Sequence, residues 1–176
     1  MNNANFVSVH EQLLALAAEL GSILKARNYK LALAESCTGG MATQYTTAIA
    51  GSSAWLDRSF ITYSNAAKIE MLLVRPATLT KFGAVSEQTA CEMAKGALAN
   101  SEANITASIT GIAGPDGGSV EKPVGTVCFA ICANFTNTSP HTLSKTQYLL
   151  GNREEIRMQS VKFIFEQLLI YISTTV

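Results

Sequence analysis

The sequence predicts an α/β protein: a three-layer α/β/α sandwich around a mixed, mostly parallel sheet of about five strands. Short apolar segments with strand-like patterns recur along the 176 residues. Segments with a helical spacing of apolar residues separate most of them, as expected for parallel strands joined by crossover helices. The last two predicted strands follow one another without a helix, so this part of the sheet should be antiparallel.

Elements of the first half of the chain follow from apolar spacing. Leucines and alanines at helical intervals predict a helix over residues 6–26, and a short apolar run predicts a strand over 31–34. The glycines after this strand open a second, short helix. Alternation predicts a strand over 58–63, Asn65 is the expected N-cap of the next helix, and Pro76 begins a further helical turn.

The second half continues this alternation and then departs from it. Ser86, followed by Thr89 and Glu92, begins a helix that should last to about residue 100. A closing helix over 153–172 has Asn152 as N-cap and Glu155 in a variant of the capping box. Strands are expected over residues 104–109, 124–133 and 142–150.

The composition indicates one globular domain, and we expect residues 1–176 to form it. The chain is 48% hydrophobic and 15% charged, which suits a protein that buries a single core. Thirteen basic residues balance thirteen acidic ones without a dense basic cluster, so we expect a small-molecule partner and no nucleic acid. Neither a signal peptide nor an apolar run of about 20 residues is visible, which predicts a cytoplasmic protein that does not bind membranes.

Two polar, glycine-rich segments follow strands of the predicted sheet. AESCTGG comes after the first predicted strand, and TGIAGPDGG comes after the third, the one over residues 104–109. Ligands of open α/β sheets bind beyond the carboxyl ends of the strands, and glycines there let backbone N–H groups approach an anion. The alternative for the first segment is that its glycines only permit close packing while its hydroxyls cap a helix. The substrate-binding residues expected from both segments are Thr38, Gly39, Gly40, Gly111 and Gly114.

Ser36 in the first of these segments could act as a nucleophile if a base lies beside it. Neither His10 nor His141 has a suitable position in the sequence. A lysine in the crevice could serve, because burial lowers the pKa of an amine towards neutrality. Lys68, just beyond the second strand, is the candidate; the alternative is that it is a solvated helix lysine.

No metal or other cofactor is expected. The two histidines lie far apart, and the four cysteines lack the C-x-x-C spacing of common zinc sites. In a cytosolic chain these cysteines are expected as small core residues without disulfides.

Five segments together resemble the CinA C-terminal domain family, and within it the stand-alone nicotinamide-nucleotide amidohydrolases. They occur in the family's order, and the similarity covers about residues 8–172. Each segment alone is a weak signal, whereas the set is specific. The segments are AESCTGG, AGSSAWLDRSFITYSNAAK, GAVSE, SITGIAGPDGGSVEKPVGTV and GNREEIR.

The resemblance implies hydrolysis of the carboxamide of nicotinamide mononucleotide to nicotinate mononucleotide and ammonia, in pyridine-nucleotide salvage. It implies a Ser–Lys pair without a metal, with Ser36 as nucleophile and Lys68 as its base. Tyr63 resembles a further catalytic residue, and Thr110 and Arg153 resemble supporting residues. The other reading is a catalytically silent nucleotide-binding or regulatory paralogue.

Arg153 begins the closing helix, where its guanidinium and the positive end of the helix dipole could bind a phosphate or a ribose oxygen. A generic surface arginine is the alternative. The family commonly has Asp where this chain has Asn152; Asn caps a helix equally well, but the lost charge beside Arg153 could change substrate affinity. A homodimer is expected, because two-fold assemblies are the commonest.

Overall fold

The computed structural model of the protein describes residues 3–135 and 140–175. Its sheet has the strand order β2-β1-β3-β4-β5. β1 pairs in parallel with β2 and β3, whereas the β3–β4 and β4–β5 pairs are antiparallel. The expected mixed sheet is therefore confirmed: the pairings divide evenly, and β4 alone runs against the other strands. The strands are Leu31–Glu35 (β1), Leu56–Ile61 (β2), Ile105–Gly111 (β3), Thr126–Ala133 (β4) and His141–Tyr148 (β5).

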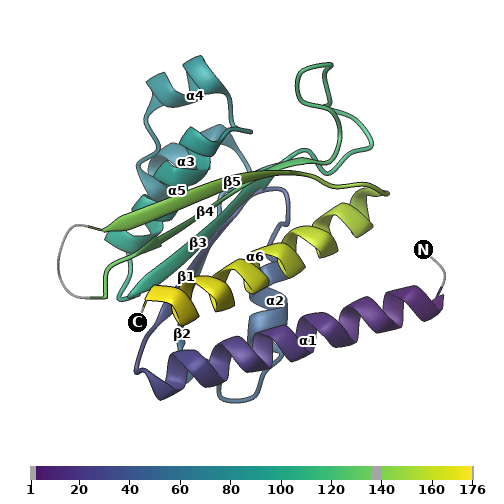
Figure 1. Ribbon diagram of the computed structural model, residues 1–176. Coiled ribbons are helices and arrows are strands. Elements are labelled where there is room, and N and C mark those ends of the chain that lie inside the picture. The colour runs from purple at the N-terminus through teal and green to yellow at the C-terminus, as the bar shows by residue number, and fades with distance from the viewer. Residues whose placement is uncertain (1–2, 136–139, 176) are drawn as a thin grey trace.

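Helices cover both faces of the sheet, which confirms the α/β/α layering (Figure 1). One layer contains α1, α2 and α6, and the other contains α3, α4 and α5. A short 3-10 helix, η1, precedes β2. The helices are Asn3–Ala26 (α1), Met41–Thr47 (α2), Ser52–Ala54 (η1), Asn65–Leu72 (α3), Pro76–Phe82 (α4), Glu87–Ala99 (α5) and Arg153–Thr175 (α6).

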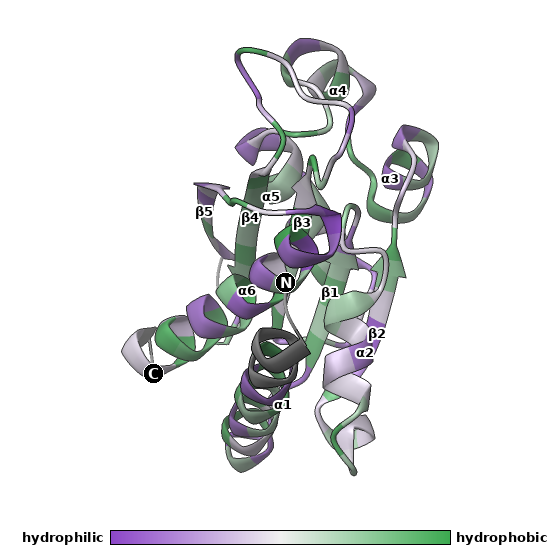
Figure 2. Ribbon diagram, turned by 90° about the vertical axis from the view of Figure 1, so that its right-hand side faces the viewer, coloured by the Kyte–Doolittle hydropathy of each residue, from purple (hydrophilic) through white to green (hydrophobic). Residues whose placement is uncertain are grey.

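The core divides between the two faces because side chains alternate along each strand. On β4, Phe129 and Ile131 belong to the cluster shared with α1 and α6, whereas Cys128 and Cys132 pack against α5. β1, β3 and β4 are buried along nearly their whole length. Figure 2 shows these strands as mainly apolar, while α6 alternates between apolar and polar residues. The edge strand β5 is largely exposed.

Helix starts follow the predicted capping chemistry with one correction. The Asn152 side chain accepts hydrogen bonds from the N–H groups of Glu154 and Glu155, and Glu155 accepts one from the Asn152 N–H, which completes the capping box. Before α3, however, the N-cap is Ser64, whose hydroxyl accepts from the Ala67 N–H. The prediction of Asn65 as the cap was wrong by one residue, and Asn65 is instead the first residue of the helix.

Strand boundaries differ from the prediction at β2, which ends at Ile61, so Tyr63 lies outside it. β4 begins at Thr126 and β5 ends at Tyr148, each two residues inside the expected limits. Part of the polar loop expected between β4 and β5 lies outside the described residues. β1 and β3, in contrast, extend one and two residues beyond the expected ends, to Glu35 and Gly111.

Candidate active site

A pocket lies where the carboxyl ends of β1, β2 and β3 meet. Its volume is about 270 Å³, and its walls come from segments that are far apart in the sequence. The parallel pairings bring these segments together, because Glu35, Ile61 and Ile109 occupy one level of the sheet. The lining residues fall within 36–37, 63–68, 84–85 and 110–117, together with Arg153.

Ser36 and Lys68 meet at the base of this pocket. Ser36 follows β1, and its N–H donates to the Ile109 carbonyl at 2.9 Å, which extends the β1–β3 ladder to the serine itself. Lys68 lies one turn into α3, and its Nζ donates to Ser36 Oγ at 2.9 Å and to the Thr62 carbonyl at 2.7 Å. Lys68 is 1% exposed and Ser36 is 8% exposed. The alternative of a solvated helix lysine is therefore wrong.

The environment of Lys68 favours its neutral form. Burial lowers its pKa from 10.5 to about 8, since an ammonium group loses hydration inside the protein. No ion pair to a carboxylate opposes this effect among the described salt bridges. A large fraction of Lys68 is consequently unprotonated in mildly alkaline solution, where it can accept a proton from the Ser36 hydroxyl.

Cys37 also lines the pocket, beside the serine. Burial raises the pKa of its thiol from 9.0 to about 12, so the thiol stays protonated near neutral pH. A protonated thiol is a poor nucleophile. The chemistry of this pair of neighbours therefore favours Ser36.

Glu35 is a functional residue that sequence reasoning missed. Its side chain is fully buried and accepts hydrogen bonds from the N–H groups of Gly40, Ala42 and Thr43 and from the Thr43 hydroxyl. It thus caps α2 from five residues before the N-cap, Gly40, and ties the loop that carries the serine to the helix. AESCTGG shows a carboxylate between a strand and a helix, but Glu35 lies five residues before the N-cap, so spacing alone did not identify it as the cap.

This cap changes the expectation for Thr38, Gly39 and Gly40. None of the three lines the pocket, because the first N–H groups of α2 are turned towards Glu35 and not towards a ligand. Ser36 and Thr38 do not cap the helix either. Gly39 and Gly40 have φ angles of 58° and 94°, a left-handed conformation that favours glycine, so they shape the turn. Arg157 holds the same loop by donating to the Thr38 carbonyl.

Arg153 and Tyr63 join two walls of the pocket. The Arg153 guanidinium donates to the Gly114 carbonyl at 2.7 Å and to the Tyr63 hydroxyl at 2.9 Å. Tyr63 is 62% exposed and lies at the rim, whereas Ser36 lies at the base. Arg153 is an exposed residue, but it lines the pocket and two of its nitrogens have partners there; its role in binding substrate stays a prediction.

Thr110, Gly111 and Gly114 all line the pocket. The Thr110 hydroxyl donates to the Ala84 carbonyl at 2.8 Å, so it links β3 to the opposite wall. Gly111 has no room for a side chain, because a Cβ would lie 2.8 Å from the Thr126 carbonyl oxygen. Two further polar residues line the pocket and were not expected from the sequence as site residues: Asn65 and Asp116.

Neither histidine lines the pocket, and three of the four cysteines are buried as expected while Cys91 is only partly buried. His10 contacts Tyr45, and His141, at the opposite end of the sheet from the pocket, contacts Tyr171. All four cysteines are free, and Cys37, Cys128 and Cys132 are buried. Within residues 3–135 and 140–175, no three His, Cys, Asp or Glu side chains gather as metal ligands would. The helices described there include none of the length and apolarity that a membrane span requires.

Known proteins are similar to this chain in sequence and in fold. The model of the CinA C-terminal domain matches residues 13–172. The chain is 51% identical to the nicotinamide-nucleotide amidohydrolase PncC of Enterobacter agglomerans over 84% of this chain and 88% of that protein, and 46% identical to PncC of Escherichia coli K12 over 89% and 93%. The crystal structure of the competence/damage inducible protein CihA from Agrobacterium tumefaciens is 45% identical, with a TM-score of 0.85 over 93% of this chain and 96% of that one.

Proposed function

The chain belongs to the CinA C-terminal domain family, and from this premise we propose that it is a nicotinamide-nucleotide amidohydrolase. Its substrate would be nicotinamide mononucleotide, and its products nicotinate mononucleotide and ammonia. The similarity to two PncC proteins over most of their lengths supports this activity. The observation that carries the chemistry is the buried hydrogen bond of 2.9 Å between Lys68 Nζ and Ser36 Oγ.

The proposed reaction is a two-step acyl transfer. Neutral Lys68 accepts the Ser36 proton while Oγ attacks the carboxamide carbon, and Lys68 returns the proton to the departing nitrogen as the C–N bond breaks. Water then attacks the acyl–serine ester while Lys68 accepts its proton; as the C–Oγ bond breaks, Lys68 returns that proton to Ser36 Oγ, and the nicotinic acid group leaves and loses its own proton to solvent. The Thr62 carbonyl, at 2.7 Å from Nζ, keeps the amine oriented through both steps.

The oxyanion of each tetrahedral intermediate needs hydrogen-bond donors, each worth about 3–4 kcal/mol in well-studied enzymes. The N–H groups of Gly39 and Gly40 already donate to the Ser36 carbonyl and to Glu35. We therefore assign the oxyanion to the N–H of Cys37, the residue that directly follows the nucleophile and lines the pocket.

Arg153 is the proposed contact for the nucleotide's phosphate or ribose. Two of its nitrogens are held by Gly114 and Tyr63, so the guanidinium enters the pocket with a fixed geometry. A cation so placed attracts the phosphate dianion, and its preorganisation lowers the entropic cost of binding. Tyr63 supports the guanidinium from the rim.

The test is ammonia release from nicotinamide mononucleotide by the wild type, Ser36→Ala and Lys68→Met. Both variants should lose at least about a thousandfold in kcat, and the double variant should lose no more, because the two groups act as one unit. Ser53→Ala and Lys95→Met, at exposed positions, are the matched controls and should behave as the wild type. Nucleotide binding without turnover by the wild type would instead support the silent paralogue.

We further propose that residues 1–176 act as one amidohydrolase domain in the cytoplasm, where pyridine nucleotides are recycled, and that the chain forms a homodimer. An apolar hollow of about 230 Å³ between β5 and α6 supports self-association, since Leu143 and Ile170 are exposed beside it. Sedimentation of the purified protein tests the dimer.

A further inference from the structure

One side of the pocket is built from two irregular segments. The first is the connection from α4 to α5, over residues 82–86, which contributes Ala84 and Val85 to the lining. The second is the long loop over residues 112–125, which lines the pocket from Ile112 to Gly117. Apart from Phe82, the last residue of α4, neither segment belongs to a helix or a strand. The binding geometry of the pocket therefore depends on what holds these two segments.

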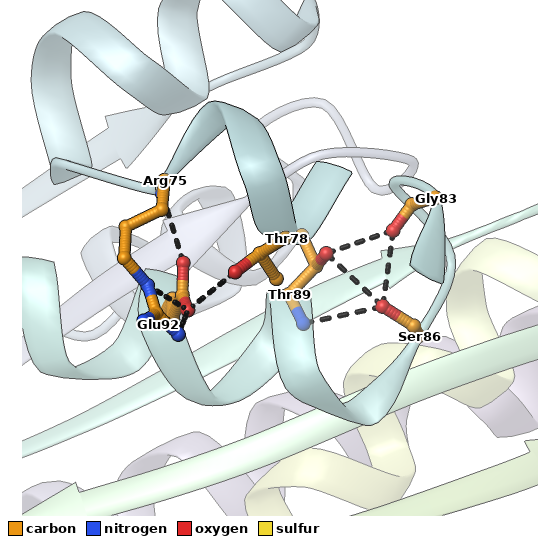
Figure 3. A network of polar contacts seen from close by, with 6 residues as sticks. All are labelled: Arg75, Thr78, Gly83, Ser86, Thr89 and Glu92. Carbon is orange, nitrogen blue, oxygen red and sulfur yellow. Dashed lines mark hydrogen bonds and ion pairs between the residues drawn. The ribbon is translucent and has the colours of Figure 1, made fainter. Parts of the chain in front are cut away.

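Side chains hold every carbonyl of the connection from Phe82 to Val85. The Gly83 carbonyl accepts from the hydroxyls of Ser86 and Thr89, at 3.0 and 2.8 Å (Figure 3). The Ala84 carbonyl accepts from Thr110. The remaining two, those of Phe82 and Val85, accept from one group, the Lys122 ammonium, at 2.8 and 2.7 Å.

The start of this connection is fixed from a second direction. Glu92 on α5 accepts hydrogen bonds from the Thr78 hydroxyl and from the backbone and side chain of Arg75, which anchors α4 to α5 (Figure 3). Phe82 is the last residue of α4. Lys122 therefore acts on a connection between two helices that are already tied to each other.

Lys122 belongs to the second segment, so it links the two. Its backbone closes a turn with Ser119, since the Ser119 N–H donates to the Lys122 carbonyl and the Lys122 N–H donates to the Ser119 hydroxyl. The base of the loop is closed separately, by bonds between Ile112 and residues 125–126. The ammonium is thus the contact between the far end of the loop and the connection, about 40 residues earlier in the chain.

We propose that Lys122 is a positioning residue for substrate binding. It touches no residue that would react, and it does not line the pocket. It fixes the two walls, 82–86 and 112–125, at the separation that the nucleotide requires. Ser36 follows β1 and Lys68 lies on α3, and Lys122 donates to neither of these elements, so its removal should act on KM more than on kcat. The expected effect on KM rests on the proposed function, whereas the link that Lys122 makes between the two walls does not.

The experiment compares Lys122→Met, Lys122→Arg and the exposed control Lys95→Met. Hydrogen–deuterium exchange of the intact proteins reports on the walls without any substrate. Lys122→Met should speed exchange in peptides covering 82–89 and 112–125 at least several-fold, and leave peptides of β1 and β3 unchanged. Lys122→Arg should restore much of the protection, because a guanidinium also carries several donors. Equal exchange in Lys122→Met and the wild type would overturn the proposal.

Kinetics with nicotinamide mononucleotide provide the second readout. Lys122→Met should raise KM roughly five- to tenfold with kcat within about threefold of the wild type, and Lys122→Arg should recover most of the difference. An unchanged KM, or a loss confined to kcat, would overturn the positioning role. A wild type that releases no ammonia would refute the proposed function instead, while the exchange measurement would still decide the role of Lys122.

Discussion

Replacing Lys68 by Met should change how protein stability depends on pH. In the folded protein the pKa of Lys68 is about 8, whereas its ordinary value is 10.5. Below about pH 8 both the folded and the unfolded chain bind the proton, and the folded state bears the full cost of a buried ammonium. Between the two pKa values only the unfolded chain is protonated, so the stability of the wild type rises with pH. Above the higher value the cost has vanished.

The magnitude follows from the two pKa values. Their difference corresponds to about 3 kcal/mol, and Lys68 is buried enough that solvent does not screen it. The free energy of unfolding of the wild type, minus that of Lys68→Met, should therefore rise by about 2 kcal/mol between about pH 7 and about pH 9.5. Hydrogen bonds lost to Ser36 and Thr62 add an offset that does not depend on pH.

Urea unfolding at several pH values measures this difference, and subtraction removes the other titrating groups, which both proteins share. Lys95→Met, at an exposed position, should show no such trend against the wild type. If the difference in the free energy of unfolding between the wild type and Lys68→Met stays constant from about pH 7 to about pH 9.5, the argument is refuted, because Lys68 would then have an ordinary pKa in the folded protein.

Three further perturbations test other parts of the site. Arg153→Ala should raise KM for nicotinamide mononucleotide roughly 10–100-fold with a smaller change in kcat, because a charge-assisted contact to the nucleotide is lost. Arg153→Lys should recover only part of this KM. A collapse of kcat at constant KM in steady-state assays would show that Arg153 stabilises the transition state instead. Glu35→Gln should lower the free energy of unfolding by about 3 kcal/mol in urea titrations, because a buried amide NH₂ would face the first N–H groups of α2. The control Glu70→Gln, at an exposed position, should change this free energy little. A loss below about 1 kcal/mol in Glu35→Gln would contradict the capping role. Exhaustive treatment with EDTA should leave the rate of ammonia release unchanged, as a Ser–Lys mechanism requires no metal; loss of activity that zinc or manganese restores would rule out that mechanism.

The sequence predicted the layers and the strands well, because these depend on periodicity that is local and strong. Its error at Asn65 and its failure to find the Glu35 cap of α2 have one physical origin: an N-cap is decided by which neighbouring oxygen reaches the first N–H groups. Ser64 and Asn65 are both good caps, and only the path of the chain selects between them. Glu35 could not be assigned to α2 from spacing alone, since the intervening turn through Gly39 and Gly40 brings it back.

The site was predicted in part. Ser36, Lys68, Tyr63, Thr110 and Arg153 came together in one pocket, because Thr110 lies at the end of β3 and the other four follow strands that end at the same edge of the sheet. The hydrogen bonds that hold the walls of this pocket together could not be predicted from the sequence. Lys122 contacts carbonyls of Phe82 and Val85, and no sequence pattern reports a side chain that binds backbone groups of a distant loop.

The pH dependence of kcat/KM for ammonia release from nicotinamide mononucleotide tests the central claim most directly, because it joins the proposed substrate to the Ser36–Lys68 pair. Only the neutral amine of Lys68 can accept the Ser36 proton, and burial lowers its pKa to about 8. The rate constant should therefore rise about tenfold per pH unit below that value and level off above it. A profile that is flat from about pH 6 to pH 10, or that falls across this range, would contradict the account.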